Sequence, residues 1–374
     1  MLTSDKVIVQ LIVDQCEKNG IKHIVFSPGS RNAPLAIAFD EHNSFITHVI
    51  HDERSAAFFA LGLAQELKEA VAICCTSGSA VLNYYPAIAE AYYRSIPLLI
   101  LSADRPPHLI NQGDGQTIVQ KDVFKNHVHE SLNLNDQLVS DSEIWEIQTQ
   151  TSKALNKLSS AWKGPVHINI GLDEPLYNKV EKTKNYARTI SEIENDKQLS
   201  PDFCDEAREI LPRSKVLVLC GQMENNERLL RELVLFSDNT NVLVLVENTA
   251  NLQDQQFIHC IDRSLNQFDH NKEEYHPDVL ITIGGAVVSK KIKTFLRNSK
   301  PKHHWRIGAD FPEMNTYSCL SCSLEMTPER FFLELNKLKI EVNKLNYSGL
   351  WKKQDILAKD KIPAVIKTTR CSLT

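Results

Sequence analysis

Short apolar runs alternate with amphipathic stretches over the first 175 residues of the chain. The apolar runs are rich in Val and Ile, and each predicts a buried strand, at residues 23–26, 47–50, 70–75, 98–102 and 166–170. Apolar side chains recur at helical spacing over residues 1–20, 55–65, 80–93 and 144–158. Because parallel strands need crossover connections, this alternation predicts a parallel sheet with helices on both faces.

The pattern changes at about residue 176. Residues 176–199 are charged and polar with few apolar anchors, which is typical of a linker. A second α/β block is predicted over residues 200–343, with strands at 216–219, 241–246, 279–283 and 303–307 and helices at 226–235, 289–296 and 328–343. Thr327 is the expected N-cap of the last helix and Pro328 its first residue. Residues 344–374 are expected to be a weakly structured tail. The alternation of strands and helices in the rest of the chain predicts an α/β fold class, with two doubly wound parallel-sheet domains at residues 1–175 and 200–343.

Composition and charge exclude several classes of protein. The 374 residues are 42% hydrophobic, enough for more than one core, and a formal net charge of −5 offers no basic surplus for nucleic acid. No apolar run approaches the roughly 18 residues of a membrane span, and the charges within the first twenty residues are unlike those of a signal peptide. Nine cysteines without framework spacing indicate reduced thiols, so we expect a cytoplasmic protein.

Three loops follow predicted strands and precede predicted helices, where ligands bind in open α/β sheets. In SPGSRN (27–32), Gly29 permits a tight turn and Arg31 offers a planar fork of donors to a carboxylate or phosphate. The alternative is an ordinary turn capped by Ser30 or Asn32. In HDERSAA (51–57), a carboxylate such as Glu53 could relay a proton to a ligand nitrogen, or Asp52 and Glu53 could simply cap the helix.

The third loop, TSGSA (76–80), has only small side chains. Ser77, Gly78 and Ser79 would let a flat heterocycle approach the backbone closely. Small residues are common in such turns, so the signal comes from three loops of this kind opening on one sheet edge.

Later segments add donors for an anion. Pro106 and Pro107 stiffen the chain after Arg105, and Gln116 lies in a polar, flexible segment; each is otherwise a surface residue. Lys290 and Lys291 follow a Gly-Gly pair that does not match a dinucleotide fingerprint, and they either hold an anionic substrate or form a solvated face. The lone CxxC at 319–322 lacks a second pair of zinc ligands, which indicates ordinary thiols.

Taken in order, the strings SPGSRNAPLAIAF, HDERSAAFFALGLA, CTSGSAVLNYYPAIAEAYY, PLLILSADRPP and GQTIVQ resemble the thiamine-diphosphate-dependent 2-succinyl-5-enolpyruvyl-6-hydroxy-3-cyclohexene-1-carboxylate synthases of menaquinone biosynthesis. The resemblance is dense over residues 2–175 and looser to about residue 343. It implies that residues 1–175 bind the pyrimidine ring of the cofactor and that residues 200–343 are a central domain. It also implies a reaction, in which 2-oxoglutarate is decarboxylated and joined to isochorismate.

The resemblance assigns roles to individual residues. Glu53 matches the glutamate that contacts the aminopyrimidine nitrogen of the cofactor, next to the loop of residues 77–79. Ser30, Arg31, Arg105 and Gln116 match residues that gather the isochorismate carboxylates. Lys290 and Lys291 fall where the family usually has a Lys-Arg pair, and lysine keeps the charge but loses the bidentate fork.

One part of the family pattern has no counterpart. The family holds the diphosphate and its divalent ion (Mg²⁺, or manganese) in a C-terminal domain through a Gly-Asp motif, whereas Gly113-Asp114-Gly115 occurs too early in this chain. The expectation is therefore a chain without metal ligands that is inactive alone. The family further implies a homodimer or homotetramer, since Glu53 of one subunit acts on cofactor held by its partner.

Two other functions remain open from the sequence. An acetolactate-synthase-like enzyme would use a small acceptor, for which Arg31, Arg105 and Gln116 are not all needed. A non-catalytic dimerising module would pair with a subunit that supplies the diphosphate-binding part.

Overall fold

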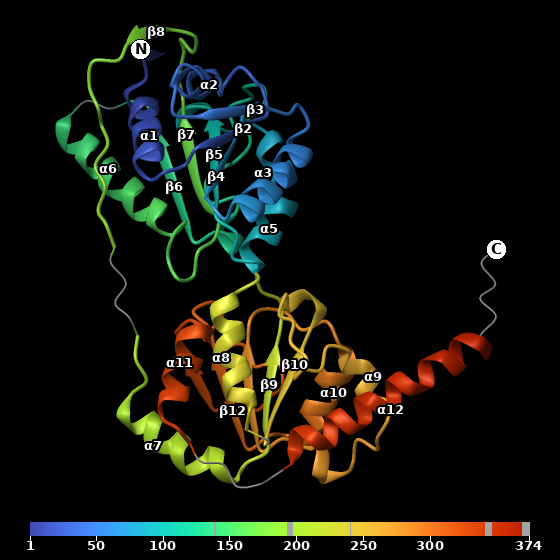
Figure 1. Ribbon diagram of the computed structural model, residues 1–374. Coiled ribbons are helices and arrows are strands. Elements are labelled where there is room, and N and C mark those ends of the chain that lie inside the picture. The colour runs from blue at the N-terminus through green and yellow to red at the C-terminus, as the bar shows by residue number, and fades with distance from the viewer. Residues whose placement is uncertain (138–139, 193–196, 240, 341–345, 369–374) are drawn as a thin grey trace. The chain divides into compact units, whose positions relative to one another are not determined.

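The chain divides into two compact units, Met1–Glu194 and Asn195–Thr374 (Figure 1). The computed structural model describes residues 1–137, 140–192, 197–239, 241–340 and 346–368, with backbone alone from residue 362. Within these ranges, no helix is both long and apolar enough to cross a bilayer.

The first unit is built around a six-stranded parallel sheet with the spatial order β3-β2-β4-β5-β7-β6. Its strands are β2 (His23–Phe26), β3 (Ile46–Val49), β4 (Val71–Cys75), β5 (Leu98–Asp104), β6 (Glu130–Asn135) and β7 (Val166–Gly171). Five of them match the predicted apolar runs. The strand β6 is not predicted, because its sequence ESLNLN is half polar. An edge strand such as β6, which has one neighbour in the sheet, tolerates polar residues.

Helices cover both faces of this sheet (Figure 1). One face carries α1 (Val7–Lys18), α2 (Ala33–Asp40) and α6 (Asp141–Asn156), and the other carries α3 (Glu53–Leu67), α4 (Ala80–Asn83) and α5 (Tyr85–Tyr93). Successive side chains of a strand point to opposite faces, so Ile24 and Phe26 of β2 enter one core and Val25 enters the other. The predicted doubly wound α/β class is therefore confirmed for this unit.

The strand order places a switch point between β2 and β4. The chain runs from β2 outward to β3 and then returns to β4 on the other side of β2. Loops that leave the carboxyl ends of strands on either side of such a point diverge and leave a crevice for a ligand. The loops of residues 27–32 and 76–79 leave β2 and β4 at this point.

The expected linker differs from the structure over its first part. β8 (Lys179–Glu181) pairs antiparallel with β1 (Leu2–Ser4). Beyond it, the Asp14 carboxylate accepts from the Tyr186 N–H at 2.7 Å, and Gln15 Nε2 donates to the Arg188 carbonyl at 2.7 Å. These polar side chains and backbone groups attach the segment to α1, so its polar composition reflects surface packing. Residues 193–196 of the expected linker lie outside the described residues.

The second unit has a five-stranded parallel sheet of order β10-β9-β11-β12-β13. The strands are β9 (Val216–Cys220), β10 (Val242–Val246), β11 (Val279–Ile283), β12 (His303–Ile307) and β13 (Cys322–Leu324). One face packs against α7 (Pro201–Ile210), α8 (Glu227–Ser237) and α11 (Pro328–Lys337), and the other against α9 (Ile261–Leu265), α10 (Lys290–Ser299) and α12 (Tyr347–Thr368). Short 3₁₀ turns lie at Pro107–Leu109, Lys125–His127, Leu211–Arg213, Asn248–Ala250 and Glu273–Tyr275.

The expectation of a weak tail after residue 343 is wrong where the structure describes it. Tyr347 and Trp351 of α12 are buried in the core shared with α9 and α10, and the Tyr347 hydroxyl donates to the Tyr275 carbonyl at 2.9 Å. Asp355 also pairs with Arg263 of α9 at 2.8 Å. Its apolar residues are interrupted by Gly349 and by several Lys and Asp residues, and tertiary contacts at one end stabilise the helix. The predicted helix at 328–343 ends at Lys337, and residues 341–343 lie outside the described residues.

Candidate functional site

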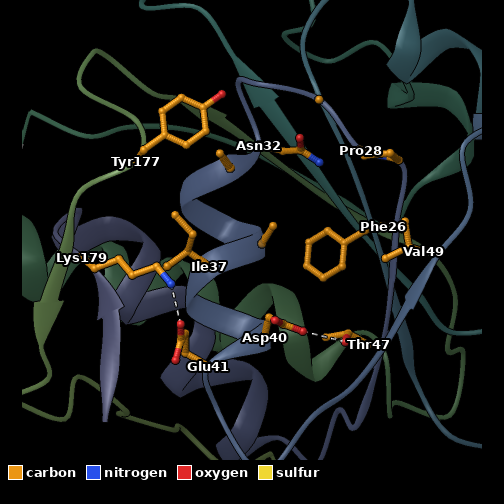
Figure 2. Close-up of a pocket in the computed structure, with 13 residues that line it drawn as sticks. Phe26, Pro28, Asn32, Ile37, Asp40, Glu41, Thr47, Val49, Tyr177 and Lys179 are labelled. Carbon is orange, nitrogen blue, oxygen red and sulfur yellow. Dashed lines mark hydrogen bonds and ion pairs between the residues drawn. The ribbon is translucent and has the colours of Figure 1, made fainter.

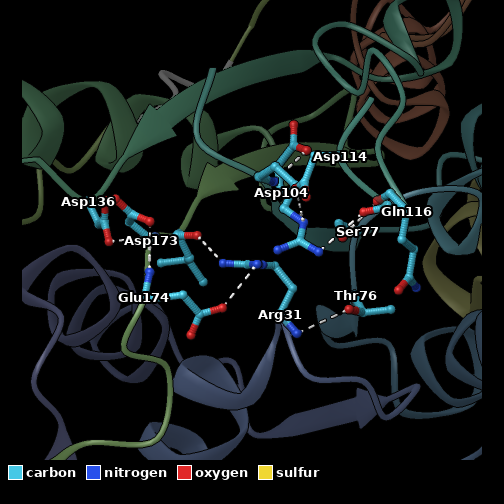
Figure 3. Close-up of polar contacts among 12 residues, drawn as sticks. Arg31, Thr76, Ser77, Asp104, Asp114, Gln116, Asp136, Asp173 and Glu174 are labelled. Carbon is cyan, nitrogen blue, oxygen red and sulfur yellow. Dashed lines mark hydrogen bonds and ion pairs between the residues drawn. The ribbon is translucent and has the colours of Figure 1, made fainter. Parts of the chain in front are cut away.

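Arg31 is held near the carboxyl end of β2 by contacts of its guanidinium group and of its backbone N–H. Its Nη1 donates to the Leu172 carbonyl at 2.8 Å, and its Nη2 pairs with Glu174 Oε1 at 3.2 Å (Figure 3). The Arg31 N–H donates to Thr76 Oγ1 at 3.3 Å, which ties this loop to the loop after β4. The Arg31 side chain is buried, so its conformation is restricted, whereas the neighbouring Ser30 is exposed.

Glu53 is the first residue of α3, directly after the loop that leaves β3. Asp52 is the N-cap of this helix, because its carboxylate accepts from the Ser55 N–H at 2.7 Å and its pKa is lowered by that bond. Glu53 therefore does not serve as the cap. Within the part of the chain that the structure describes, the half-buried Glu53 carboxylate has no hydrogen-bond or ion-pair partner.

The Glu53 carboxylate is close enough to the end of β4 to affect the pKa values of side chains there. Burial raises the pKa of the Cys75 thiol and of the Tyr84 hydroxyl, and the Glu53 carboxylate adds to both increases. Tyr84 in turn donates to Ser27 Oγ at 3.1 Å, at the carboxyl end of β2. The unpaired carboxylate therefore lies close to the loops that leave β2 and β4.

The loop of residues 76–79 is tightly packed. Gly78 has φ of +83°, and a Cβ there would come within 2.8 Å of Gln116 Cγ, so glycine is needed on both counts. Ser77 Oγ donates to the Gln116 carbonyl at 3.1 Å, and Ser79 is exposed. A Cβ on Gly29 would overlap the Thr76 side chain, so the backbone of the loop after β2 packs directly against the Thr76 side chain of the loop after β4.

Arg105 follows β5 and faces the segment that contains Gln116. Its Nε lies 3.2 Å from Asp114 Oδ2, and its Nη2 donates to the Gly115 carbonyl at 3.2 Å. The Nε of Arg105 and the Oδ2 of Asp114 are both buried without a well-formed hydrogen bond. This ion pair is thus imperfect, and the guanidinium retains capacity for an anion.

Asp104 lies between the two arginines. Its Oδ1 accepts the Arg105 N–H at 2.8 Å, and its Oδ2 accepts from Asn169 Nδ2 at 2.8 Å. Burial raises the pKa of the Asp104 carboxyl to about 6, against the opposing effects of the Asn169 hydrogen bond and the Arg31 charge. The local electrostatics therefore contain two guanidinium cations and one carboxyl that is only partly ionised near pH 6.

Seven of the predicted residues, those in the segments 30–31, 77–79, 105 and 116, thus lie on loops that hydrogen bonds link to one another. Figure 3 shows Arg31, Ser77 and Gln116 among them. The charge of Glu53 acts on Cys75, at the end of the neighbouring strand β4. Sequence reasoning missed Asp104, Gln120 and Asn169, which are buried and connect the loops from behind. A signal for Asn169 exists: His167 and Asn169 are polar residues at alternate positions of a strand that is otherwise fully apolar.

Lys290 and Lys291 belong to the second unit. Both are exposed and open α10, whose N-cap Ser289 accepts from the Ile292 N–H at 3.1 Å. Lys291 Nζ donates to Asn266 Oδ1 at 2.5 Å. Lys290 remains a predicted anion ligand, and only its position at the start of α10 supports the prediction.

A cavity of about 380 Å³ lies beside the turn after β2, and Pro28, Gly29 and Asn32 of that turn line part of it. Phe26, Ile37 and Val49 line its apolar wall, between α2 and β3 (Figure 2). At its rim, Lys179 pairs with Glu41 and Thr47 donates to Asp40. None of the predicted site residues lines this cavity, so it is a neighbouring feature and not the predicted site.

Metal binding in proteins relies on clusters of acidic, histidine and cysteine side chains. Among the residues that the structure describes, no group of three or more of them is arranged to hold a metal ion.

Comparisons with known proteins identify the family of the chain. The family model described as "Thiamine pyrophosphate enzyme, N-terminal TPP binding domain" matches residues 7–129. The chain is 45% identical over 334 residues to the 2-succinyl-5-enolpyruvyl-6-hydroxy-3-cyclohexene-1-carboxylate synthase of Christiangramia forsetii, covering 84% of this chain and 58% of the relative. For the synthases of the same name from Flavobacterium psychrophilum and Desulfotalea psychrophila, the identities are 42% and 40%, covering 91% and 87% of this chain and 61% of each relative. The chain thus spans about three fifths of the length of the curated relatives it matches.

Proposed function

The chain belongs to the family of 2-succinyl-5-enolpyruvyl-6-hydroxy-3-cyclohexene-1-carboxylate synthases, which are thiamine pyrophosphate enzymes, and from this premise we propose that it acts in menaquinone biosynthesis. The proposed reaction joins decarboxylated 2-oxoglutarate to isochorismate. The two arginines at the sheet edge are the observation that carries this choice, because isochorismate brings two carboxylates and each guanidinium offers a cationic partner to one of them.

Thiamine diphosphate fits the residues that surround Glu53. The carboxylate has no partner among the described residues, and its charge acts on the end of β4, from which the loop of Ser77, Gly78 and Ser79 leaves. When bound, the cofactor supplies an electron sink for decarboxylation. Glu53 would hold a proton at the pyrimidine nitrogen, and Gly78 would let the ring approach the loop.

Ser30, Arg31, Arg105 and Gln116 would bind and orient isochorismate. Arg31 is rigid, so it would fix one carboxylate close to the turn after β2. Arg105 can exchange its imperfect contact with Asp114 for a ligand carboxylate. Gln116 is exposed and offers an amide donor beside it. Lys290 and Lys291 are further proposed anion ligands on the second unit.

The remaining parts of the proposal concern the metal, the assembly and the compartment. Mg²⁺ would accompany the diphosphate, and no described residues are assigned to it. A homodimer or homotetramer is supported by exposed apolar side chains on α3 and α5, among them Phe58, Phe59 and Tyr93. A cytoplasmic location is supported by the free cysteines, eight of which the structure describes.

The function is tested by incubating the protein with thiamine diphosphate, Mg²⁺, isochorismate and either 2-oxoglutarate or pyruvate, with products identified by mass spectrometry. The chain by itself is expected to be inactive. When the diphosphate-binding part of a relative is supplied, the expected product is the succinyl adduct of isochorismate, formed with 2-oxoglutarate and not with pyruvate. Acetolactate from pyruvate would favour an acetolactate-synthase-like enzyme. Isochorismate binding by calorimetry with no product under any condition would favour a non-catalytic module.

Replacing Glu53 by Gln removes the carboxylate and keeps its shape. We expect synthase turnover to fall by about 10²-fold or more, because the proton at the pyrimidine nitrogen is no longer shared with an acid. Glu66→Gln on the exposed side of the same helix is the matched control and should leave turnover unchanged. Equal turnover of the Glu53 variant and wild type would contradict the role of Glu53.

A further inference from the structure

A chain of buried hydrogen bonds joins the loop that carries Gly78 to the loop that carries Arg105. It begins where the Gly78 N–H donates to Gln120 Oε1 at 2.8 Å. Gln120 Nε2 donates to Asn169 Oδ1 at 2.9 Å, and Asn169 Nδ2 donates to Asp104 Oδ2 at 2.8 Å. The other oxygen of Asp104 accepts the Arg105 N–H at 2.8 Å.

Each link in this chain has one possible direction. A backbone N–H can only donate, so Gln120 must present its oxygen to Gly78 and its NH₂ group to the other side. On that side both neighbours are acceptors, Asn169 Oδ1 and the Ala103 carbonyl at 3.2 Å. Asn169 is then oriented as well, because its oxygen also accepts from Ser102 Oγ at 2.7 Å.

The chain lies in the interior of the unit. Gln120 is fully buried, and Asn169 and Asp104 are 5% and 2% exposed. Burying an amide costs free energy unless both of its ends are hydrogen-bonded. A leucine fills a similar volume without that cost, so packing alone does not require glutamine at position 120.

We propose that Gln120 is a positioning residue that couples the Gly78 loop to the Arg105 loop. The inference rests on the proposed function, in which Gly78 faces the cofactor and Arg105 faces a carboxylate of the acceptor. Gln120 touches neither ligand and acts through the Gly78 N–H and through Asn169. Because coupling between two sites is reciprocal, a ligand that orders one loop also favours the bound arrangement of the other.

The coupling is tested by amide hydrogen exchange of the ligand-free protein, read at Gly78 and Arg105 by NMR with isotope-labelled glycine and arginine. In Gln120→Leu both amides should lose protection by about tenfold or more, although Arg105 does not touch residue 120. Gln65→Glu, at an exposed position of α3, should leave both amides unchanged.

Gln120→Glu separates hydrogen bonding from packing. An ionised carboxylate accepts from Gly78 and repels the two acceptors on its other side, whereas a protonated carboxyl donates to one of them. Relative to wild type at the same pH, protection of the Arg105 amide should therefore be restored at about pH 5, because burial favours the protonated form. A purely space-filling role would give no such restoration over the leucine variant.

Two outcomes would overturn the proposal: wild-type protection of Arg105 in Gln120→Leu, or identical Arg105 protection in the leucine and glutamate variants at every pH. Since no ligand or turnover enters the measurement, it is independent of the synthase assay. A protein that shows the coupling but makes no product even when the diphosphate-binding part is supplied would refute the proposed function and leave the coupling in place. Product formation without the coupling would support the proposed function and refute the coupling through Gln120.

Discussion

Arg31 and Arg105 are oriented by their own chain before any ligand binds. The Leu172 carbonyl and Glu174 hold Arg31, and Asp114 and Gly115 hold Arg105. A guanidinium held in this way loses less side-chain entropy when it binds an anion. Glu174 and Asp114 occupy donors that a ligand carboxylate would take over, so binding would exchange one carboxylate for another.

Asp104 makes the stability of the first unit depend on pH. Burial raises the pKa of its carboxyl from 3.8 to about 6 in the folded state, so the folded protein holds the proton more tightly than the unfolded chain. The stabilisation is therefore complete below about pH 4 and is lost as pH rises through about 6. The loss is up to about 3 kcal/mol, at 1.36 kcal/mol for each unit of pKa difference.

The Asp104→Asn variant cannot ionise and should lack this pH dependence. We expect the free energy of unfolding of wild type, minus that of the variant, to decrease between pH 4 and 6.5 in urea titrations. The asparagine also loses one acceptor, which adds an offset that does not vary with pH, so only the slope is diagnostic. A constant difference over this range would show that Asp104 ionises normally.

At the scale of elements, α12 differs most from its sequence pattern. Its apolar residues are interrupted by Gly349 and by several Lys and Asp residues, yet Trp351 inserts fully into the core formed by α9, α10 and the second sheet. Similarly, β6 is half polar and is found as a strand only because β7 supplies its backbone partners. In both elements a neighbour distant in sequence provides the stabilising contacts, and local periodicity does not record that neighbour.

Trp351→Ala should destabilise the second unit by about 3–5 kcal/mol, the usual cost of deleting a large buried aromatic side chain. Ile356→Ala on the same helix is the matched control, since Ile356 is 57% exposed, and it should change stability by about 0.5 kcal/mol or less. Chemical denaturation followed by far-UV circular dichroism measures both. Equal effects of the two substitutions would mean that α12 does not pack against the core.

At the scale of the whole molecule, each unit has its own sheet and its own two cores. In the first unit the strands are covered by helices of residues 7–156, and in the second by helices of residues 201–361. A unit that buries its own apolar faces has what it needs to fold independently. The predicted division into two α/β blocks anticipates this arrangement, because the alternation of strands and helices restarts after the polar segment.

The fragments Met1–Glu194 and Asn195–Thr374 should each fold alone. We expect cooperative thermal unfolding of both by calorimetry, with transitions close to those of the intact protein. A fragment that stays unfolded under native conditions would show that its core depends on the other unit. If both fragments fold, Trp351→Ala should lower the unfolding temperature of the second fragment, and the first fragment should unfold at the same temperature as before.

The amino-acid pattern determined the fold class, the loops that carry Arg31, Glu53, Gly78 and Arg105, and their common sheet edge. Those features are local, since hydrophobic period and loop position are properties of neighbouring residues. The partners of these side chains required the folded chain: Arg31 bonds to a residue 141 positions away, and Gly78 bonds to one 42 positions away. Hydrogen bonds over such separations depend on how the strands are ordered, and strand order is set by packing of the whole unit.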